Sequence, residues 1–415
     1  MCTTLFWIFI LIITCDYLLG VYLDYLNKKQ SSKGIPEELN GLYDSEKVEQ
    51  QKQYFAANYH FNQVSNLFSF IVLLLMFFLF GFAFFDNLVR SFSDNTIVVA
   101  LLFFGLLYIA NDLITIPFSA YHTFKIEEKF GFNKMTPVLF FTDILKEWIM
   151  TALLGGVIIS LLMLIYQYTG GYFWIIGWAF MSLLSIFMMM FYSNLIVPLF
   201  NKQTPLEEGE LRNKIEDFCQ KVGFELDNLF VIDGSKRTTK ANAYFSGLGR
   251  KKRIVLYDTL IEKLTPEEIV AVLAHEIGHY KHKHTLMMLI LSIINTGVMF
   301  YLLSIALGTP ENGNLYIAEA LGSSHPSFQF GVIVFGILYT PISTFLGIFI
   351  NFISRKNEYQ ADDFAKNNGL GTHLGEALKK LSTSSLSNLN PHPKYVFFHY
   401  SHPTLLQRVR KIKTM

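Results

Sequence analysis

The chain has 415 residues, of which 52% are hydrophobic and only 16% are charged, whereas an average soluble domain has about 25% charged residues. This composition excludes an ordinary soluble protein and predicts a chain that lies largely in lipid. The net charge of +1 provides no basic surplus of the kind found in nucleic-acid-binding proteins, so no nucleic-acid partner is expected. The cysteines Cys2, Cys15 and Cys219 have no metal-type spacing and predict no disulfide framework.

Seven apolar stretches are long enough to cross roughly 30 Å of hydrocarbon. They are Thr4–Tyr22, Leu67–Phe85, Ile97–Ile116, Trp148–Tyr168, Phe173–Ile196, Leu286–Leu307 and Phe330–Ile353. The first stretch contains Asp16 and lacks both a basic start and a clear small-residue cleavage site. We therefore interpret it as a retained span and not as a cleaved signal peptide.

The loops between these spans predict the orientation in the membrane. Of the 34 Lys and Arg residues, only Arg90 lies in a loop on the same side as the N-terminus. Positive residues collect in cytoplasmic loops, so the polar segments should face the cytoplasm. The predicted parts are spans one to five over residues 1–200, a polar module over 201–284, spans six and seven over 285–353, and a C-terminal segment over 354–415.

The polar module reads as a small α+β unit. A helical pattern over Leu206–Gly223 is followed by short apolar runs typical of strands. These runs are Leu229–Ile232, Ala243–Ser246 and Arg253–Tyr257. Next, Thr265-Pro266-Glu267-Glu268 has the pattern of a capping box, which predicts a helix from this point through Tyr280. In the C-terminal segment, helices are predicted near Leu374–Leu381 and Thr404–Ile412.

The predicted helix contains the run His275-Glu276-Ile277-Gly278-His279. Residues four apart lie about 40° apart on one helix face, so both imidazoles can reach one zinc ion. Glu276 follows the first histidine and can address a water bound to the metal, which is the arrangement of metalloproteases. The alternative is a chance match on a solvated helix face, and we favour the metal site because a further ligand can be identified.

Zinc hydrolases use three protein ligands and leave one position for water. Glu358 follows the seventh span on the same side of the membrane as His275 and is the best candidate for the third ligand. Asp362 lies one helical turn further and can hold the free N–H of a ligand histidine. The alternative is a solvated acidic pair beside Asp363.

Two more histidines follow the motif. His282 is interpreted as an exposed residue in a Lys-rich helix end. His284 could contact the rim of the site, but the polar end of the sixth span explains it equally well.

The sequence closely resembles the type I CAAX prenyl protease family over nearly its whole length. The resemblance rests on several motifs in the family's order. They are Phe124–Lys134, Asn242-Ala243-Tyr244, the His275–His279 motif, Glu358–Asp362, and Ser401-His402-Pro403 followed by Arg408. It implies a multi-pass α-helical membrane protein whose seven helices form a hollow barrel around a chamber, with a cytoplasmic α+β zinc metalloprotease domain.

The resemblance also implies roles for individual residues. Asn242, Ala243 and Tyr244 would belong to an edge strand that pairs with an extended peptide. His402 would stand near the single Zn²⁺ ion and donate to the developing oxyanion. Arg408 would form an ion pair with Asp362. Without the family, a surface turn, a helix cap and a solvated helix face would explain Asn242, His402 and Arg408.

The expected reaction is hydrolysis of a peptide bond by metal-activated water, with Glu276 as general base and no covalent intermediate. The expected substrate is a peptide or protein, with a prenylated C-terminus as the class that the family implies. Bacterial relatives share the pattern, so an alternative is membrane-protein quality control in a bacterial inner membrane. In a eukaryote the endoplasmic reticulum is expected, and Lys411 and Lys413 match a dilysine retrieval signal. A catalytically inactive seven-span scaffold or transporter is the alternative of another class, and the oligomeric state stays open.

Overall fold

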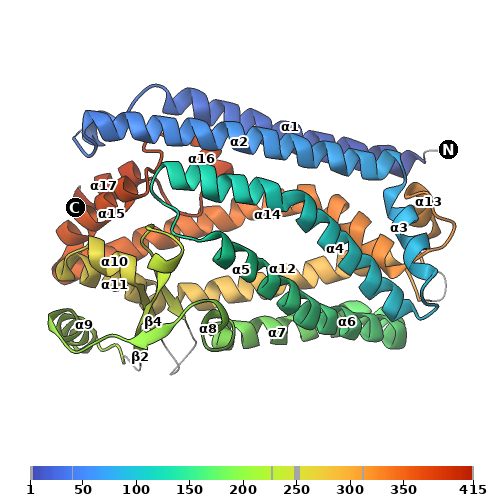
Figure 1. Ribbon diagram of the computed structural model, residues 1–415. Helices are drawn as coiled ribbons and strands as arrows, with labels where there is room; N and C mark the ends of the chain where they lie inside the picture. The colour runs from blue at the N-terminus through green and yellow to red at the C-terminus, as the bar shows by residue number, and fades with distance from the viewer. Residues whose placement is uncertain (1–2, 40, 226–227, 247–252, 311–312, 414–415) are drawn as a thin grey trace.

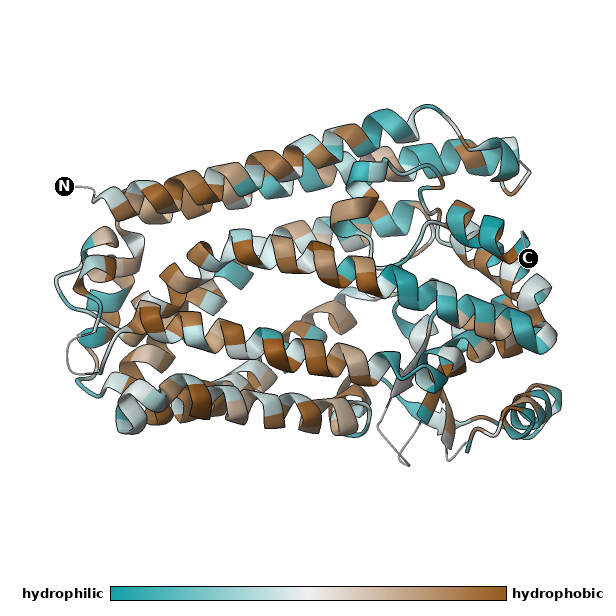
Figure 2. Cartoon of the chain, turned by 180° about the vertical axis from the view of Figure 1, so that it is seen from behind, coloured by the Kyte–Doolittle hydropathy of each residue, from teal (hydrophilic) through white to brown (hydrophobic). Residues whose placement is uncertain are grey.

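The long helices of the chain run side by side along one axis, with the N-terminus at one end and the C-terminus at the other (Figure 1). The structure is a computed structural model that describes residues 3–39, 41–225, 228–246, 253–310 and 313–413. Apolar residues fill the long helices, and polar residues gather at the end that holds the C-terminus (Figure 2). The molecule therefore has an apolar half and a polar end.

The apolar half is built from long helices. They are α1 (Thr4–Ser31), α2 (Ser45–Phe78), α4 (Thr96–Tyr121), α5 (Pro137–Met150), α6 (Gly156–Thr169), α7 (Phe173–Leu195), α12 (His284–Leu307) and α14 (Phe328–Ala365). Among the described residues, six helical segments are long and apolar enough to cross a membrane, and one of them, Pro137–Phe200, has 64 residues. This segment contains the fourth and fifth predicted spans, which are separated where Gly170 adopts a φ of 50°. The multi-pass helical fold is thus confirmed.

The long helices contact one another in a ring. Neighbours pair in the order α4, α6, α7, α12, α14, α1 and α2, and α3 (Gly81–Arg90) together with ring contacts from Phe61 and Phe68 to Phe118 joins α2 back to α4. In the most apolar window of each span, at most 17% of the residues are buried. Helices in a solid bundle bury a stripe of at least about 100°. The low burial therefore indicates that packed side chains do not fill most of the inner faces of the ring. The exception is the end that holds α3, where Phe103 of α4 packs against Phe330 of α14.

The second span differs from its prediction. The apolar stretch Leu67–Phe85 is not one helix, because α2 ends at Phe78 and α3 begins at Gly81. Between them Phe80 adopts a left-handed φ of 52°, and its ring occupies the space that a Cβ on Gly322 would need. The break is a packing effect, because Phe80 fits against a glycine that lies far away in the sequence.

The helix α3 and the short helix α13 (Leu315–Ala320) cover the end of the ring opposite to the polar end (Figure 1). Asp86 on α3 is fully buried there and accepts hydrogen bonds from Arg90 at 2.7 Å and Gln329 at 2.5 Å. This buried polar contact joins α3 to the start of α14.

The seventh predicted span, Phe330–Ile353, is only the first part of a longer helix. The helix α14 has 38 residues and continues to Ala365 without interruption. It continues past the apolar stretch because Glu358, Ala361 and Asp362 are buried on the face that packs against α11 (Pro266–Lys281). One helix therefore connects the membrane part with the polar end.

The polar end contains a four-stranded sheet with the strand order β1-β2-β4-β3. The strands are β1 (Gln203–Pro205), β2 (Asn228–Ile232), β3 (Ala243–Ser246) and β4 (Arg253–Tyr257). β2 and β4 are parallel, while β1 and β3 pair antiparallel at the two edges. The three predicted strands are confirmed. β1 was not predicted, because three residues are too short to show a periodic pattern.

Helices pack around this sheet and fill the remaining connections. The α-helices are α8 (Val197–Phe200), α9 (Glu210–Lys221), α10 (Asp258–Lys263), α11, α15 (Gly371–Ser384), α16 (Pro393–His399) and α17 (Leu405–Lys413). Short 3₁₀ segments are Glu37–Leu39, Gly170–Tyr172 and Gly234–Lys236, and π-helical turns are His122–Glu127, Thr151–Gly155 and Lys366–Leu370. The predicted helices that correspond to α9, α11, α15 and α17 are confirmed, whereas α16 was not predicted. The core between α11, α9, α15 and the sheet includes Ile254, Ala271 and Ile277.

Candidate metal centre and active site

The helix α11 is defined at its start by a reciprocal cap. The Thr265 hydroxyl accepts from the Glu268 N–H at 3.4 Å, and the Glu268 carboxylate accepts from the Thr265 N–H at 2.9 Å. Lys380 on α15 neutralises the buried Glu268 with a contact of 2.7 Å. The capping box predicted from the sequence is confirmed, and it sets the helical phase in which His275 and His279 share one face.

A glycine lets α11 approach α14 closely. A Cβ placed on Gly278 would lie 3.0 Å from the Cα of Ala361 and 3.0 Å from the Cβ of Phe364. Both atoms belong to α14 itself, one being backbone and the other the first side-chain carbon, so neither can move aside without shifting the helix. The small residue inside the histidine motif therefore permits the contact that brings Glu358 on α14 next to the two histidines.

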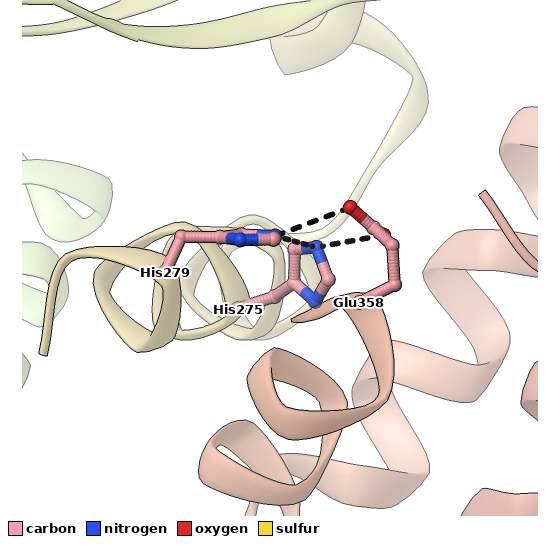
Figure 3. Close-up of side chains that lie close together, drawn as sticks. All are labelled: His275, His279 and Glu358. Carbon is pink, nitrogen blue, oxygen red and sulfur yellow. Dashed lines mark hydrogen bonds and ion pairs between the residues drawn. The ribbon is translucent and has the colours of Figure 1, made fainter. Parts of the chain in front are cut away.

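Three side chains converge at this contact (Figure 3). Donor atoms of His275, His279 and Glu358 all lie within 4.8 Å of one another. The two Nε2 atoms are 3.2 Å apart, and the Glu358 carboxylate lies 3.4 Å from His275 Nε2 and 3.2 Å from His279 Nε2. His275 and Glu358 are buried, and Glu358 Oε2, which water cannot reach, accepts no hydrogen bond from the residues that the structure describes. Two imidazoles and one carboxylate with a free buried oxygen fit a zinc ion.

Asp362 and Arg408 lie behind His275. Asp362 Oδ1 is 2.9 Å from His275 Nδ1, and the Arg408 guanidinium donates to both carboxylate oxygens at 2.6 and 2.9 Å. A carboxylate can only accept, so Nδ1 carries the proton and Nε2 keeps its lone pair directed to the site. Burial alone would lower the pKa of His275, but the neighbouring Asp362 and Glu358 carboxylates stabilise its protonated form, in which Nε2 also carries a hydrogen, and raise the pKa to about 9. A metal ion that binds here must displace a proton.

His284 takes the corresponding position behind His279. Its Nδ1 lies 3.1 Å from His279 Nδ1, and its Nε2 lies 2.8 Å from the Gln360 amide oxygen. Because the amide oxygen accepts, His284 Nε2 carries a proton and Nδ1 is left to accept from His279. With its Nδ1 protonated, His279 keeps the lone pair of Nε2, which faces Glu358. The sequence left open whether His284 contacts the site. In the structure His284 is buried beside His279, while His282 is exposed.

Glu276 lines a cavity of about 1020 Å³ together with His279. Asn242, Ala243 and Tyr244 line the same cavity. The position of Glu276 next to the first histidine, outside the group of three donors, leaves its carboxylate free to act on a molecule in the cavity.

β3 is an edge strand, and its free edge carries peptide groups. The Asn242 carbonyl accepts from the Tyr257 N–H at 3.1 Å, and Ala243 lies opposite Leu256. In an antiparallel pair, hydrogen-bonded and non-bonded positions alternate, so Ala243 turns its N–H and C=O away from β4. Its N–H is held by the Asn242 side chain at 2.9 Å. Another extended chain can replace this local contact.

The segment 124–134, one of the motifs that the family resemblance rests on, supports the approach to β3. Glu127 accepts from Tyr54 at 2.5 Å and pairs with Lys240 at 2.6 Å. Asn133 forms an isolated antiparallel bridge with Thr238. These contacts tie the loop before β3 to the membrane helices, so the free edge has a defined position relative to the ring.

His402 stands on the open side of the site. Its Nε2 lies 3.2 Å from Glu358 Oε1, and 62% of its side chain is exposed. Two residues of α14 hold the backbone before it: Asn351 donates to the Phe398 carbonyl at 2.9 Å, and Arg355 donates to the Tyr400 carbonyl at 2.5 Å. Asn351 and Arg355 could not be found from the sequence, because their hydrogen bonds among the described residues go to main-chain carbonyls.

Comparisons with known proteins agree along the whole chain. Residues 24–202 match the family described as CAAX prenyl protease N-terminal, five membrane helices, and residues 205–415 match peptidase family M48. CAAX prenyl protease 1 of Saccharomyces cerevisiae is 39% identical over 333 residues, which cover 77% of this chain and 73% of the yeast protein. The CAAX prenyl protease 1 homolog of Homo sapiens is 32% identical over 425 residues, covering 92% of this chain and 89% of the human protein.

The fold has a solved counterpart. The crystal structure of S. mikatae Ste24p superimposes with a TM-score of 0.92 at 34% sequence identity, and the match covers 100% of both chains. Together with the family matches, this shows that the chain belongs to the type I CAAX prenyl proteases, the multi-pass membrane metalloproteases of peptidase family M48.

Proposed function

We propose that the chain is a zinc endopeptidase that cleaves the C-terminal residues from prenylated proteins of the CAAX type. The observation that carries this proposal is a cavity of about 1020 Å³ that is lined by the free edge of β3, by Glu276 and by His279, one of the three grouped donors. The exposed His402 lies beside the same donor group, 3.2 Å from Glu358. The substrate class is supported by the names of the yeast and human relatives.

In this proposal His275, His279 and Glu358 hold one zinc ion. A zinc ion bound at such a site lowers the pKa of a water molecule and polarises a carbonyl group. Glu276 takes the proton from the attacking water and delivers it to the leaving amine. His402 donates to the oxyanion that develops on the scissile carbonyl. Asp362 and His284 fix the tautomers of the two ligand histidines, so that both present a lone pair.

The edge strand supplies the substrate contact. An extended peptide that lies along β3 can bond to the N–H and C=O of Ala243, which needs no particular side chain in the peptide. We expect Ala243→Pro to lower kcat/KM by about tenfold, because proline removes the N–H and one backbone hydrogen bond. The measurement is kcat/KM with zinc stoichiometry determined on the same samples.

The matched control is Ala243→Ser, which keeps the N–H and should leave kcat/KM close to the wild-type value. Equal activity of the proline and serine variants would contradict pairing at this strand and would move substrate recognition to the wall of the ring.

A pair of peptides tests the substrate class. The purified protein should cleave a prenylated CAAX peptide at the prenylated cysteine and release its last three residues, because the CAAX class is defined by this end. The products are identified by mass spectrometry alongside those of the matched unprenylated peptide. Cleavage of both peptides at equal rates would show a peptidase that does not recognise the prenyl group. If the zinc-bound protein cleaved neither peptide, the proposal would be contradicted.

We further propose that the polar end faces the cytoplasm, in the endoplasmic reticulum membrane if the host is eukaryotic, as the organisms of the named relatives favour. The distribution of Lys and Arg supports this orientation. A cysteine at Glu207, exposed between β1 and α9, should react with a membrane-impermeant thiol reagent only from the cytoplasmic face. A cysteine at Asp94, exposed between α3 and α4, should react only from the other face.

The labelling uses a background in which the native cysteines are replaced by alanine, and intact vesicles are compared with permeabilised ones. Labelling of Asp94→Cys from the cytoplasm would reverse the orientation.

A further inference from the structure

A second polar cavity of about 670 Å³ lies on the flank of the molecule, where α7 and α8 meet the sheet. Its lining includes the basic residues Lys146, Lys202, Lys236 and Arg253 and one carboxylate, Asp233. It borders the active-site cavity at Phe200 and Asn201, but the grouped histidines and Glu276 do not line it. The predicted mechanism uses none of its charged residues.

The charges of this basic cavity are not balanced from within. Lys146 lies 3.6 Å from Asp143 and donates to the Leu199 carbonyl at 3.1 Å. In the part of the chain that the structure describes, no ion pair involves the other three cations, and the Arg253 guanidinium lies over the ring of Phe230, 5.0 Å from its centroid.

The single carboxylate of the cavity is turned to the protein. Asp233 Oδ1 accepts from the Asn201 side chain at 3.0 Å and from the Lys202 N–H at 2.8 Å. Counting Lys146, Lys202, Lys236 and Arg253 against Asp233 leaves a surplus of positive charge around a polar space. Such a space favours an anion.

The cavity lies at the level where the apolar half ends. α7 is one of the long apolar helices, its last turn contributes Ser193 and Asn194 to the cavity, and α8 lies between this turn and the sheet (Figures 1 and 2). Beside the cations, Leu195 and Leu199 are each 51% exposed. Exposed leucines next to a basic cavity at a helix end suit a ligand with an anionic head and apolar chains.

We propose that this basic cavity binds the phosphate-bearing headgroup of an anionic phospholipid in the leaflet at the polar end. Basic pockets at the ends of transmembrane helices bind such headgroups, and each cation near the surface strengthens the attraction. The phosphate contacts Lys202, Lys236 and Arg253, and the acyl chains lie along Leu195 and Leu199. A headgroup with more than one negative charge matches the surplus of cations best.

Native mass spectrometry of the full chain in neutral detergent tests the proposal, and its readout does not depend on proteolysis. The probes are dioleoyl phosphatidylinositol 4-phosphate and dioleoyl phosphatidylcholine. The wild-type protein should retain one phosphatidylinositol 4-phosphate molecule at low lipid concentration and no phosphatidylcholine. The triple variant Lys202→Gln, Lys236→Gln, Arg253→Gln should bind the anionic lipid about 100-fold more weakly, since each of the three cations contributes about a fivefold factor.

The matched control removes the same charge elsewhere on the same side of the membrane. Lys28→Gln and Lys29→Gln in the last turn of α1, combined with Lys33→Gln just after this helix, should leave the first bound lipid unchanged. Equal losses in the two triple variants would mean unspecific attraction and would overturn the proposal. Unchanged zinc content and thermal midpoint in both variants show that the fold is intact.

Two further arms separate the other anions. Inositol 1,4,5-trisphosphate and inorganic phosphate lack acyl chains and should not displace the lipid at equal concentration; displacement would assign the cavity to a soluble anion. A peptide substrate with a free C-terminal carboxylate is compared with its amidated form. If the triple variant raised KM only for the free acid and bound lipid normally, the cavity would serve the substrate carboxylate and the lipid proposal would fail.

Discussion

Replacing Glu276 with glutamine should lower kcat by about 10²–10⁴, the usual effect of losing a general base. Glutamine has the same shape as glutamate, but its amide cannot take the proton that the attacking water loses. Glu276 follows His275 on α11 and lines the cavity without belonging to the three grouped donors. The chemical step should therefore slow while zinc content and fold stay normal.

The measurement is kcat and KM on the prenylated peptide, together with metal analysis of the same preparation. Glu267→Gln is a suitable control, because Glu267 lies on the first turn of the same helix and its partly exposed side chain pairs with Lys214. This control should retain nearly full activity. A Glu276→Gln variant with normal kcat and full zinc would show that Glu276 is not the general base.

The position of the two histidines could be predicted because it depends only on neighbouring residues. The Thr265 cap and the four-residue spacing of His275 and His279 are local features, and α11 forms as the pattern predicts. The strands and the polar character of the module were likewise readable from alternation and turn residues. Apolar stretches located the spans, since about 20 apolar residues are needed to cross a bilayer.

Glu358 could be predicted only by combining topology with chemistry. The sequence placed it on the same side of the membrane as the histidines, and zinc requires a third ligand. The sequence could not reveal that α14 continues unbroken from the membrane into the site, nor that Gly278 allows the close contact with Ala361. Both features depend on which helix faces pack together. A hydrophobic pattern shows that a helix has an apolar face, but it does not show which other helix packs against that face.

Other features needed tertiary contacts altogether. The left-handed turn at Phe80 exists because its ring fits against Gly322, which lies far along the chain. The position of His284 behind His279 depends on Gln360, and the position of His402 depends on Arg355. In each case the partner lies far away in the sequence, and composition or spacing does not show that the two residues meet.

Removing the carboxylate of Glu358 should remove the metal. Glu358→Ala leaves only the two histidines as protein ligands, whereas catalytic zinc sites use three. We expect the purified variant to contain almost no zinc and to have no measurable kcat, with zinc measured by metal analysis after dialysis. If Glu358→Ala kept one zinc per chain, the third ligand would lie elsewhere, and His402, at 3.2 Å from Glu358, would be examined next.

Three carboxylates near the end of α14, Glu358, Asp362 and Asp363, make this test specific, because they differ mainly in what they contact. Asp363 lies near the surface and pairs with Lys411 at 2.8 Å, so Asp363→Ala should keep full zinc. Asp362 is buried against His275 and Arg408, so Asp362→Asn should weaken zinc binding by about 10–100-fold without abolishing it. Only Glu358 should be indispensable. Equal zinc loss at all three positions would indicate a general loss of α14 packing, whereas the graded order would show that zinc binding depends on how closely each carboxylate approaches the histidines.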